Sequence, residues 1–243
     1  MAAATPSGVP LSASWRWYEH LVDTTKGQLT WEEKMRMLGS TATSDEFWSY
    51  FEHVPPPSEL FQQGVCIGRQ VELLSIFRGE VLPKWEDPTN EQGGECFARK
   101  PFPSAILNAL WEIIVLGLVS DTFGKDSIMG ARVCDKSARG RSLYRLEVWY
   151  GASAVPEEVR TALLQTFASF TLTVKEGNST HRRRLEKHEI PKFELRTHEA
   201  QKAMKLQKDI GLILPHWQKP AVDAAGSASD ILWNKPHSGL CRE

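Results

Sequence analysis

The stretch LSIFRGEVLPKWED, residues 74–87, carries the main structural signal of this chain. Aliphatic and aromatic residues dominate positions 71–78, so we expect a strand there. Gly79 then begins a loop that runs to Asn90 and carries Trp85 directly before Glu86. The strand therefore leads into a loop that offers an indole ring and an adjacent carboxylate.

A second tryptophan, Trp31 in QLTWE at residues 28–32, completes a possible binding site. Two indole faces can hold a flat cationic base while a neighbouring carboxylate accepts hydrogen bonds from its edge. The N7-methylated guanine of an mRNA cap suits this arrangement, because methylation makes the purine positive. Each ring face then contributes a cation–π interaction of about 0.5–2 kcal/mol. The carboxylate adds charge-assisted bonds worth roughly 1.5–3 kcal/mol.

Composition limits the classes of function open to the chain. Its 243 residues suffice for one domain with tails. The formal net charge is −1, so any contact with nucleic acid must be local, because a general phosphate-binding surface needs a strong basic excess. Nine tryptophans are many for this length, and tryptophan is enriched at binding surfaces.

The cysteines and the N-terminus favour a cytoplasmic protein. Four cysteines occur without CxxC pairing or metal-ligand spacing, which indicates a reducing compartment. The first nine residues have no signal-peptide pattern, and we expect them to be disordered. The apolar run at 105–119 contains Asn108 and Glu112 and is short for a membrane span, so it predicts a buried helix.

Most other segments predict strands. Thr43 and Glu46 form a capping-box signal for a helix over residues 45–53, and a triple proline from Pro55 stops it. Residues 58–70 are expected to form a loop. Further helices are expected at 104–119, from Pro156, and at 200–213. Strands are expected at 11–20, 34–38, 71–78, around 96–97, and at 128–136, 141–151, 172–174 and 193–197. Strands outnumber helices, which indicates an α+β fold with a mostly antiparallel sheet and helices on one face.

Two of these strands, 128–136 and 141–151, are joined by a short turn and predict a hairpin with a basic face. Side chains alternate across a strand, so the apolar side chains of both strands can share one face. The opposite face would then carry Arg132, Lys136, Arg145 and Trp149. An aromatic ring beside several cations suits a nucleotide with a phosphate chain, although a solvated strand face has the same pattern.

From about Pro10 to His198 the chain resembles the cap-binding translation initiation factor, initiation factor 4E. The resemblance rests on residues 74–87, followed by Asn90 and the glycine pair 93–94, and on the 17-residue step from Trp31 to Trp48. It implies a curved, cupped antiparallel sheet with about three helices on its convex face. It also implies a domain at residues 10–200 and a partly mobile C-terminal extension at 201–243.

The resemblance also implies roles for individual residues. Trp31 and Trp85 would stack on the cap base, Glu86 would read the guanine edge, and Trp149 would contact the N7-methyl group. Lys136 and Arg145 would hold the cap phosphates with help from Arg132, and Lys202 or Lys205 could add a contact. A helical partner peptide with a Tyr-x-x-x-x-Leu-apolar pattern would bind the convex face at Pro10, Trp48, Ile113 and Leu116.

Departures from the family pattern leave alternatives open. Glu95 stands where the family has a phosphate-side arginine, which predicts weaker cap binding. Ser44 and Glu112 replace apolar residues on the partner face. The segment His181–Arg184 is expected to be a solvated loop, with RNA or partner contact as the alternative, and residues 231–233 are a candidate docking segment. A protein-interaction module or translational repressor with weakened cap binding is the alternative function. We find no catalytic motif, metal site or cofactor motif, and therefore expect a protein that is not an enzyme.

Overall fold

The computed structural model describes residues 8–24, 27–62, 70–124, 126–176 and 179–213. The strands are β1 Pro10–Leu21, β2 Met35–Thr43, β3 Val71–Arg78, β4 Gly94–Lys100, β5 Ile128–Asp135, β6 Tyr144–Tyr150, β7 Thr171–Glu176, β8 Ser179–Arg184 and β9 Glu194–Thr197. The helices are α1 Trp31–Lys34, α2 Ser44–His53, α3 Pro57–Gln62, α4 Pro88–Glu91, α5 Ser104–Val119, α6 Pro156–Ser169 and α7 His198–Ile213. The expected α+β class is confirmed.

Within the described residues, seven strands form one antiparallel sheet in the order β2-β1-β3-β5-β6-β4-β9. The register pairs Tyr18 with Ser75, Ser75 with Arg132, and Arg132 with Glu147. Directly paired residues point to the same side of a sheet, so these side chains form one continuous row across four strands. This row belongs to the sheet face that the long helices leave uncovered.

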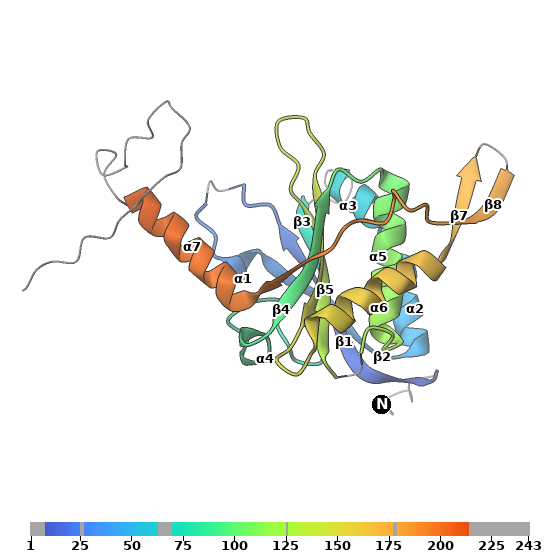
Figure 1. Cartoon of the computed structure of the whole chain (residues 1–243), viewed down its shortest axis with the longest axis horizontal. Coiled ribbons are helices and arrows are strands. Elements are labelled where there is room, and N and C mark those ends of the chain that lie inside the picture. The colour runs from blue at the N-terminus through green and yellow to red at the C-terminus, as the bar shows by residue number, and fades with distance from the viewer. Residues whose placement is uncertain (1–7, 25–26, 63–69, 125, 177–178, 214–243) are drawn as a thin grey trace, which may run out of the picture. The chain divides into compact units, whose positions relative to one another are not determined.

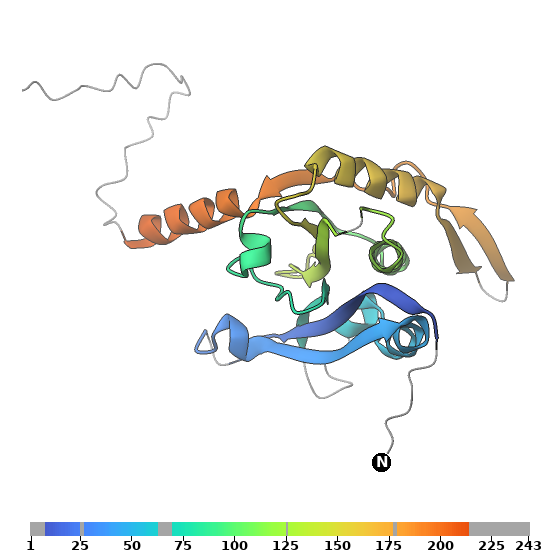
Figure 2. The same cartoon turned by 90° about the horizontal axis from the view of Figure 1, so that it is seen from below.

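The other face of the sheet is covered by helices. Figures 1 and 2 show α2, α5 and α6 on one side of the sheet and the short α1 and α4 on the other. The main core lies between the sheet and the long helices and includes Trp15, Trp17, Phe47, Trp111 and Phe167. Three long helices on this face match the expected number, and of the four further helices in the described residues only α7 was predicted.

The predicted loop at 58–70 is wrong in its first part, where α3 forms. Leu60 and Phe61 are buried in the main core. Ser58 binds Asn108 of α5 twice, through its backbone N–H to Oδ1 at 3.0 Å and through its hydroxyl, which accepts from Nδ2 at 2.9 Å. Tertiary packing therefore stabilises a helix that the polar local sequence did not indicate.

The turn between β5 and β6 explains why the strands are shorter than expected. Arg139 and Gly140 both have positive φ angles, 51° and 75°. Successive positive φ values are typical of the tight turns that match the twist of a hairpin. Ala138 and Arg141 form an isolated bridge next to this turn, and regular pairing begins only at Tyr144.

The expectation of a loop at His181–Arg184 is also wrong, because these residues belong to β8, which pairs with β7. Arg183 binds Glu189 with both guanidinium nitrogens, at 2.6 and 2.7 Å. A bidentate pair of this kind fixes the end of the hairpin against the segment that follows it. These hydrogen bonds from Arg183 also lower the pKa of Glu189 to about 2.

The chain divides into two compact units after Met204, within α7. Of the nine N-terminal residues expected to be disordered, 1–7 lie outside the described residues, as does the docking segment at 231–233. Val9 is bound to Ser44 twice, its N–H donating to the hydroxyl at 3.0 Å and its carbonyl oxygen accepting from the Ser44 N–H at 2.8 Å. None of the described helices has both the length and the apolar composition to cross a membrane, α5 included. The domain boundary after residue 200 stays a prediction.

Candidate functional site

Trp31 is the first residue of α1, on the sheet face that the long helices leave uncovered. The short helix forms because Thr30 and Glu33 cap it reciprocally: the Thr30 N–H donates to the Glu33 carboxylate at 2.6 Å, and the Glu33 N–H donates to the Thr30 hydroxyl at 3.2 Å. The Trp31 ring lies on the edge of His20, with 4.1 Å between ring centres. Burial, with Arg132 and nearby lysines, lowers the pKa of His20 to about 3, so Trp31 rests on a neutral imidazole.

Trp85 lies in the loop after β3, and buried polar groups hold this loop in shape. The Asn90 side chain donates to the carbonyl oxygens of Leu82 and Lys84 at 2.8 and 2.9 Å. Asp87 accepts from the Leu82 N–H at 3.0 Å. The half-buried Trp85 packs beside a cluster of Tyr18, Phe77, Met129 and Trp149, while Glu86 is exposed.

An ion pair connects the two tryptophan segments. The Nζ atom of Lys84, which precedes Trp85, lies 3.5 Å from the Glu32 carboxylate, which follows Trp31. Trp31 contacts His20 of β1, and Trp85 packs against a cluster that includes Tyr18, two residues away on the same side of the strand. The structure therefore brings the neighbourhoods of Trp31 and Trp85 together over one face of the sheet.

Trp149 lies on this face of β6 and is fully buried. The Arg132 guanidinium stacks over its ring at 4.3 Å from the centre, and the His198 ring lies at 4.3 Å. Its indole N–H donates to Glu147 at 2.8 Å. Trp149 is therefore already in contact with an internal cation, and its role as an N7-methyl contact stays a prediction.

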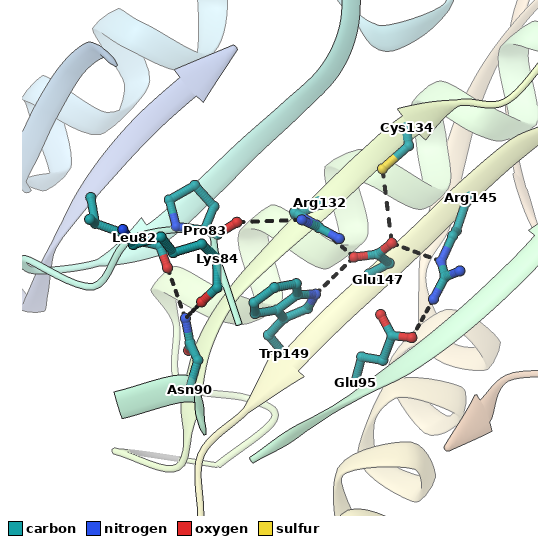
Figure 3. A network of polar contacts seen from close by, with 10 residues as sticks. All are labelled: Leu82, Pro83, Lys84, Asn90, Glu95, Arg132, Cys134, Arg145, Glu147 and Trp149. Carbon is teal, nitrogen blue, oxygen red and sulfur yellow. Dashed lines mark hydrogen bonds and ion pairs between the residues drawn. The ribbon is translucent and has the colours of Figure 1, made fainter. Parts of the chain in front are cut away.

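Glu147 is the centre of a buried charge network, drawn in Figure 3. One of its oxygens accepts from Arg132 Nε at 2.7 Å, and the other lies 2.7 Å from Arg145 Nε. Arg145 also forms an ion pair with Glu95 of β4. Two glutamates and two arginines thus neutralise one another on the face where cap phosphates were expected.

The two glutamates of the network have opposite pKa shifts. Burial raises the pKa of Glu95 to about 7, and the charge of Glu147 adds to the effect. Burial alone would also raise the pKa of Glu147, but Arg132 and Arg145 outweigh it and lower the value to about 2. Glu147 is therefore a permanent anion, whereas Glu95 changes its charge near neutral pH.

The predicted hairpin face is confirmed by the register of β5 and β6. Arg132 pairs with Glu147 and Cys134 with Arg145, so these side chains share the surface with Trp149. Lys136 lies just beyond β5 and is exposed. Glu147 lies on the same face of β6, but its pairing with both arginines and the contacts of His20 and His198 were not predicted.

On the helical face, the predicted partner residues differ in exposure. Trp48 of α2 is 46% exposed and packs edge-on against Phe47 and Phe51. Pro10 is exposed and Leu116 half-buried, but Ile113 is buried in the core. A cavity of about 210 Å³ lies beside α2 and α5, lined by Trp17, Phe51, Glu52, Val54, Pro55, Pro56, Pro57, Asn108, Trp111 and Glu112.

Comparison with known proteins identifies the family. The family model described as eukaryotic initiation factor 4E matches residues 10–206, most of the chain. The chain belongs to the eukaryotic initiation factor 4E family. Within the described residues, no group of three or more acidic, histidine or cysteine side chains is arranged to bind a metal ion.

Family members with curated names are moderately similar to this chain. Eukaryotic translation initiation factor 4E-5 of Caenorhabditis elegans is 31% identical over 153 residues, which cover 61% of this chain and 69% of the relative. Initiation factor 4E-1 of the same organism is 31% identical over 144 residues, or 58% of this chain and 61% of the relative.

Solved structures of family members share the fold. The complex of C. elegans eIF4E-3 with the 4E-binding protein Mextli and cap analog aligns with a TM-score of 0.58 at 20% identity, over 81% of this chain and 96% of that chain. A schistosome eIF4E complexed with m7GpppG and 4E-BP aligns with a TM-score of 0.57 at 21% identity, over 82% and 93%. At this identity the likeness establishes the cupped architecture of the sheet and its helices.

Proposed function

We propose that this family member binds the N7-methylguanosine cap of mRNA and acts in the cytoplasm in translation initiation, without catalysing a reaction. Trp31 and Trp85 stack on the methylated base, and Glu86 accepts hydrogen bonds from the guanine edge. Contact of the methyl group with the fully buried Trp149 requires the Arg132 or His198 side chain to move aside. The observation that carries the proposal is the Lys84–Glu32 ion pair, at 3.5 Å, which joins the two tryptophan segments over one sheet face.

The local geometry supports reversible binding of a flat cation. Trp31 and Trp85 are both half-buried, so each has ring surface that a ligand can cover. Glu86 is exposed beside Trp85 and can reach a ligand edge without leaving a buried partner unsatisfied. Stacking on two rings should favour the methylated base over plain guanine by roughly 2–4 kcal/mol, or about 30- to 1000-fold.

Titration of tryptophan fluorescence with N7-methylguanosine triphosphate and with GTP tests the proposal. The methylated nucleotide should bind at least about 30-fold more tightly. Trp31→Ala, Trp85→Ala and Glu86→Ala should each weaken its binding. Trp48→Ala is the matched control, because it removes an exposed indole from the helical face.

Equal affinity for the two nucleotides would overturn the cap-binding proposal. Loss of binding in the Trp48→Ala control would show that the site has been assigned to the wrong face. Retained binding in one of the other variants would remove that residue from the site while leaving its neighbours to be tested by the same measurement.

We further propose that the helical face binds a scaffold initiation factor or an inhibitory protein through a Tyr-x-x-x-x-Leu-apolar helix. The exposed Trp48 ring is a suitable aromatic anchor, and the cavity beside α2 and α5 can accept apolar side chains. Related structures contain 4E-BP or Mextli bound to initiation factor 4E proteins. Because Ile113 is buried, we assign it to positioning this surface rather than to direct contact.

A protein-interaction module or translational repressor with weak cap binding is the second candidate function. It is favoured by one specific observation: Arg132 and Arg145 are already paired with Glu147 and Glu95 on the proposed phosphate side. Cap binding too weak to measure, together with normal binding of the partner helix, would support this second function over the first.

A further inference from the structure

The charges on the cap-binding face are balanced within the protein itself. Arg132 and Arg145 supply two positive charges, and at contact distance two negative charges come from Glu147 and, at pH values above its raised pKa of about 7, from Glu95. Both arginines are also held by rings, Arg132 over Trp149 at 4.3 Å and Arg145 over Phe97 at 4.2 Å. Neither guanidinium can turn towards a ligand without breaking an ion pair and a stacking contact.

Several cations at the edges of this face are paired in the same way. Lys84 pairs with Glu32, Lys34 with Glu72 at 2.9 Å, Lys202 with Glu91 at 3.0 Å, and Arg16 of β1 with Glu80. Three further cations of this face form no ion pair among the described residues: Lys136 and Arg99, the register partner of Arg145, are exposed to water, and the half-buried Arg196 lies over the Phe97 ring at 4.6 Å. A phosphate chain would therefore meet mostly neutralised or solvated cations.

We propose that Glu95 and Glu147 are specificity-determining residues that make this site select its ligand by the methylated base and almost ignore the number of phosphates attached to it. This inference rests on the proposed cap-binding function and assigns the ligand class of the same site: an N7-methylguanosine with a short or weakly contacted phosphate chain.

The number of phosphates should matter little because each ligand phosphate must compete with a protein carboxylate for the same arginine. A ligand phosphate gains little from Arg145 unless it displaces Glu95, and displacement would leave a fully buried carboxylate without its cation. Glu147 is held even more firmly, because Arg132, Arg145 and the Trp149 N–H all contact it. The protein carboxylates thus occupy the positions that phosphate oxygens would otherwise take.

The experiment compares N7-methylguanosine mono-, di- and triphosphate on the same protein at pH 7.5. In the unmodified chain, the affinities for the monophosphate and the triphosphate should differ by less than about threefold, because paired and exposed charges contribute little. The triphosphate affinity should also change only slightly between low and high salt. This arm requires no variant and so does not depend on how a mutant folds.

Glu95→Gln supplies the second arm. It keeps the shape of the side chain and leaves the four-residue network with one positive charge, so triphosphate affinity should rise roughly tenfold while monophosphate affinity changes less than about threefold. Glu157→Gln is the matched control: it removes the same charge from α6, where Glu157 pairs with Arg160 on the other side of the sheet. Thermal unfolding of both variants verifies that they are folded.

The outcomes separate this inference from the function on which it rests. Failure of all three nucleotides to bind would overturn both. Binding that strengthens tenfold or more from monophosphate to triphosphate in the unmodified chain would overturn the inference and leave cap binding intact. An equal change in affinity for both nucleotides in folded Glu95→Gln would also overturn it.

Discussion

The Nζ atom of Lys84 lies 3.5 Å from the carboxylate of Glu32, and this pair joins two segments that are more than fifty residues apart in the chain. Each partner is the immediate neighbour of a tryptophan, Trp85 or Trp31. Glu32 lies on a single-turn helix and Lys84 on a loop, so neither is held by a long element. The pair therefore limits how far the two indoles can separate before a ligand arrives.

We predict that Glu32→Gln and Lys84→Met each weaken binding of a methylated cap analogue by about two- to fivefold, as expected for a partly exposed pair. The double variant should bind the cap analogue no more weakly than either single variant, because each single substitution already removes the same ion pair. Lys34→Met is the control, since Lys34 lies on the same helix but pairs with Glu72. Fully additive losses in the double variant would show that the pair does not couple the two segments.

Asn90→Ala should reduce both stability and cap affinity. The side-chain amide of the buried Asn90 donates to two backbone carbonyl groups of the Trp85 loop, whereas its backbone carbonyl oxygen, 2.7 Å from His198 Nδ1, is kept in the variant. Because the variant leaves the carbonyl groups of Leu82 and Lys84 unsatisfied, its free energy of unfolding, measured in urea, should fall by about 1–3 kcal/mol. Thr89→Ala, an exposed neighbour, should change neither property. Unchanged cap affinity in Asn90→Ala would mean that the loop keeps its shape without this residue.

The raised pKa of Glu95 predicts a pH-dependent stability. Because its value rises from 4.5 to about 7 on folding, the folded state holds the proton more tightly, and stability from this group falls as the pH rises from about 4.5 to 7. Three charged groups on β5 and β6 face Glu95: Glu147, Arg145 and Arg132. Gln201 of α7 also faces it, and Arg196 of β9 is the register partner of Glu95.

Glu95→Gln should therefore gain stability relative to the unmodified chain when the pH is raised from 5 to 8. The relative gain should be roughly 1–3 kcal/mol, measured by urea unfolding of both proteins at both pH values. For Glu157→Gln, the difference in unfolding free energy from the unmodified chain should vary much less between pH 5 and pH 8. A stability difference for Glu95→Gln that is the same at pH 5 and pH 8 would contradict the raised pKa.

Trp149→Phe should destabilise the fold by about 2–4 kcal/mol, because it leaves a cavity in a fully buried site and removes the hydrogen bond to Glu147. Trp48→Phe on the exposed surface of α2 should cost less than about 0.5 kcal/mol. Chemical denaturation of the two variants measures the contrast. A similarly small loss of unfolding free energy in both variants would mean that Trp149 is not packed as tightly as its burial indicates.

Trp48→Ala should weaken binding of a helical peptide with the Tyr-x-x-x-x-Leu-apolar pattern by tenfold or more, the usual effect of removing an aromatic anchor. Its affinity for the cap analogue should stay within about twofold, because Trp48 lies on the helical face. Fluorescence anisotropy of a labelled peptide provides the measurement. Loss of cap binding with normal peptide binding would reverse the assignment of the two faces.

Local sequence patterns predicted several elements well. The strand at 71–78 and the helix at 104–119 match β3 and α5. The capping box at Thr43 and Glu46 does begin α2, at Ser44. These signals depend on residues that are close together in the chain, such as side-chain periodicity and end caps, and they are therefore readable from the sequence.

Contacts between distant residues were less predictable. Helix α3 forms because Leu60 and Phe61 pack in the main core and Ser58 is hydrogen-bonded to Asn108, fifty residues away. The bidentate pair of Arg183 with Glu189 likewise accompanies a hairpin in a segment that reads as a solvated loop. At α3 the stabilising partners are distant in the chain, whereas the Arg183–Glu189 pair spans only six residues and was missed although it is local.

The sequence by itself determined which side chains share the face proposed to bind the cap, because alternation along β5 and β6 requires no knowledge of the rest of the chain. Only the tertiary structure decided the charge of that face, because Glu95 belongs to another strand, β4, and is buried in an ion pair with Arg145. Alternation gives the direction of a side chain, but its charge partner and its access to water depend on which segments the fold packs around it.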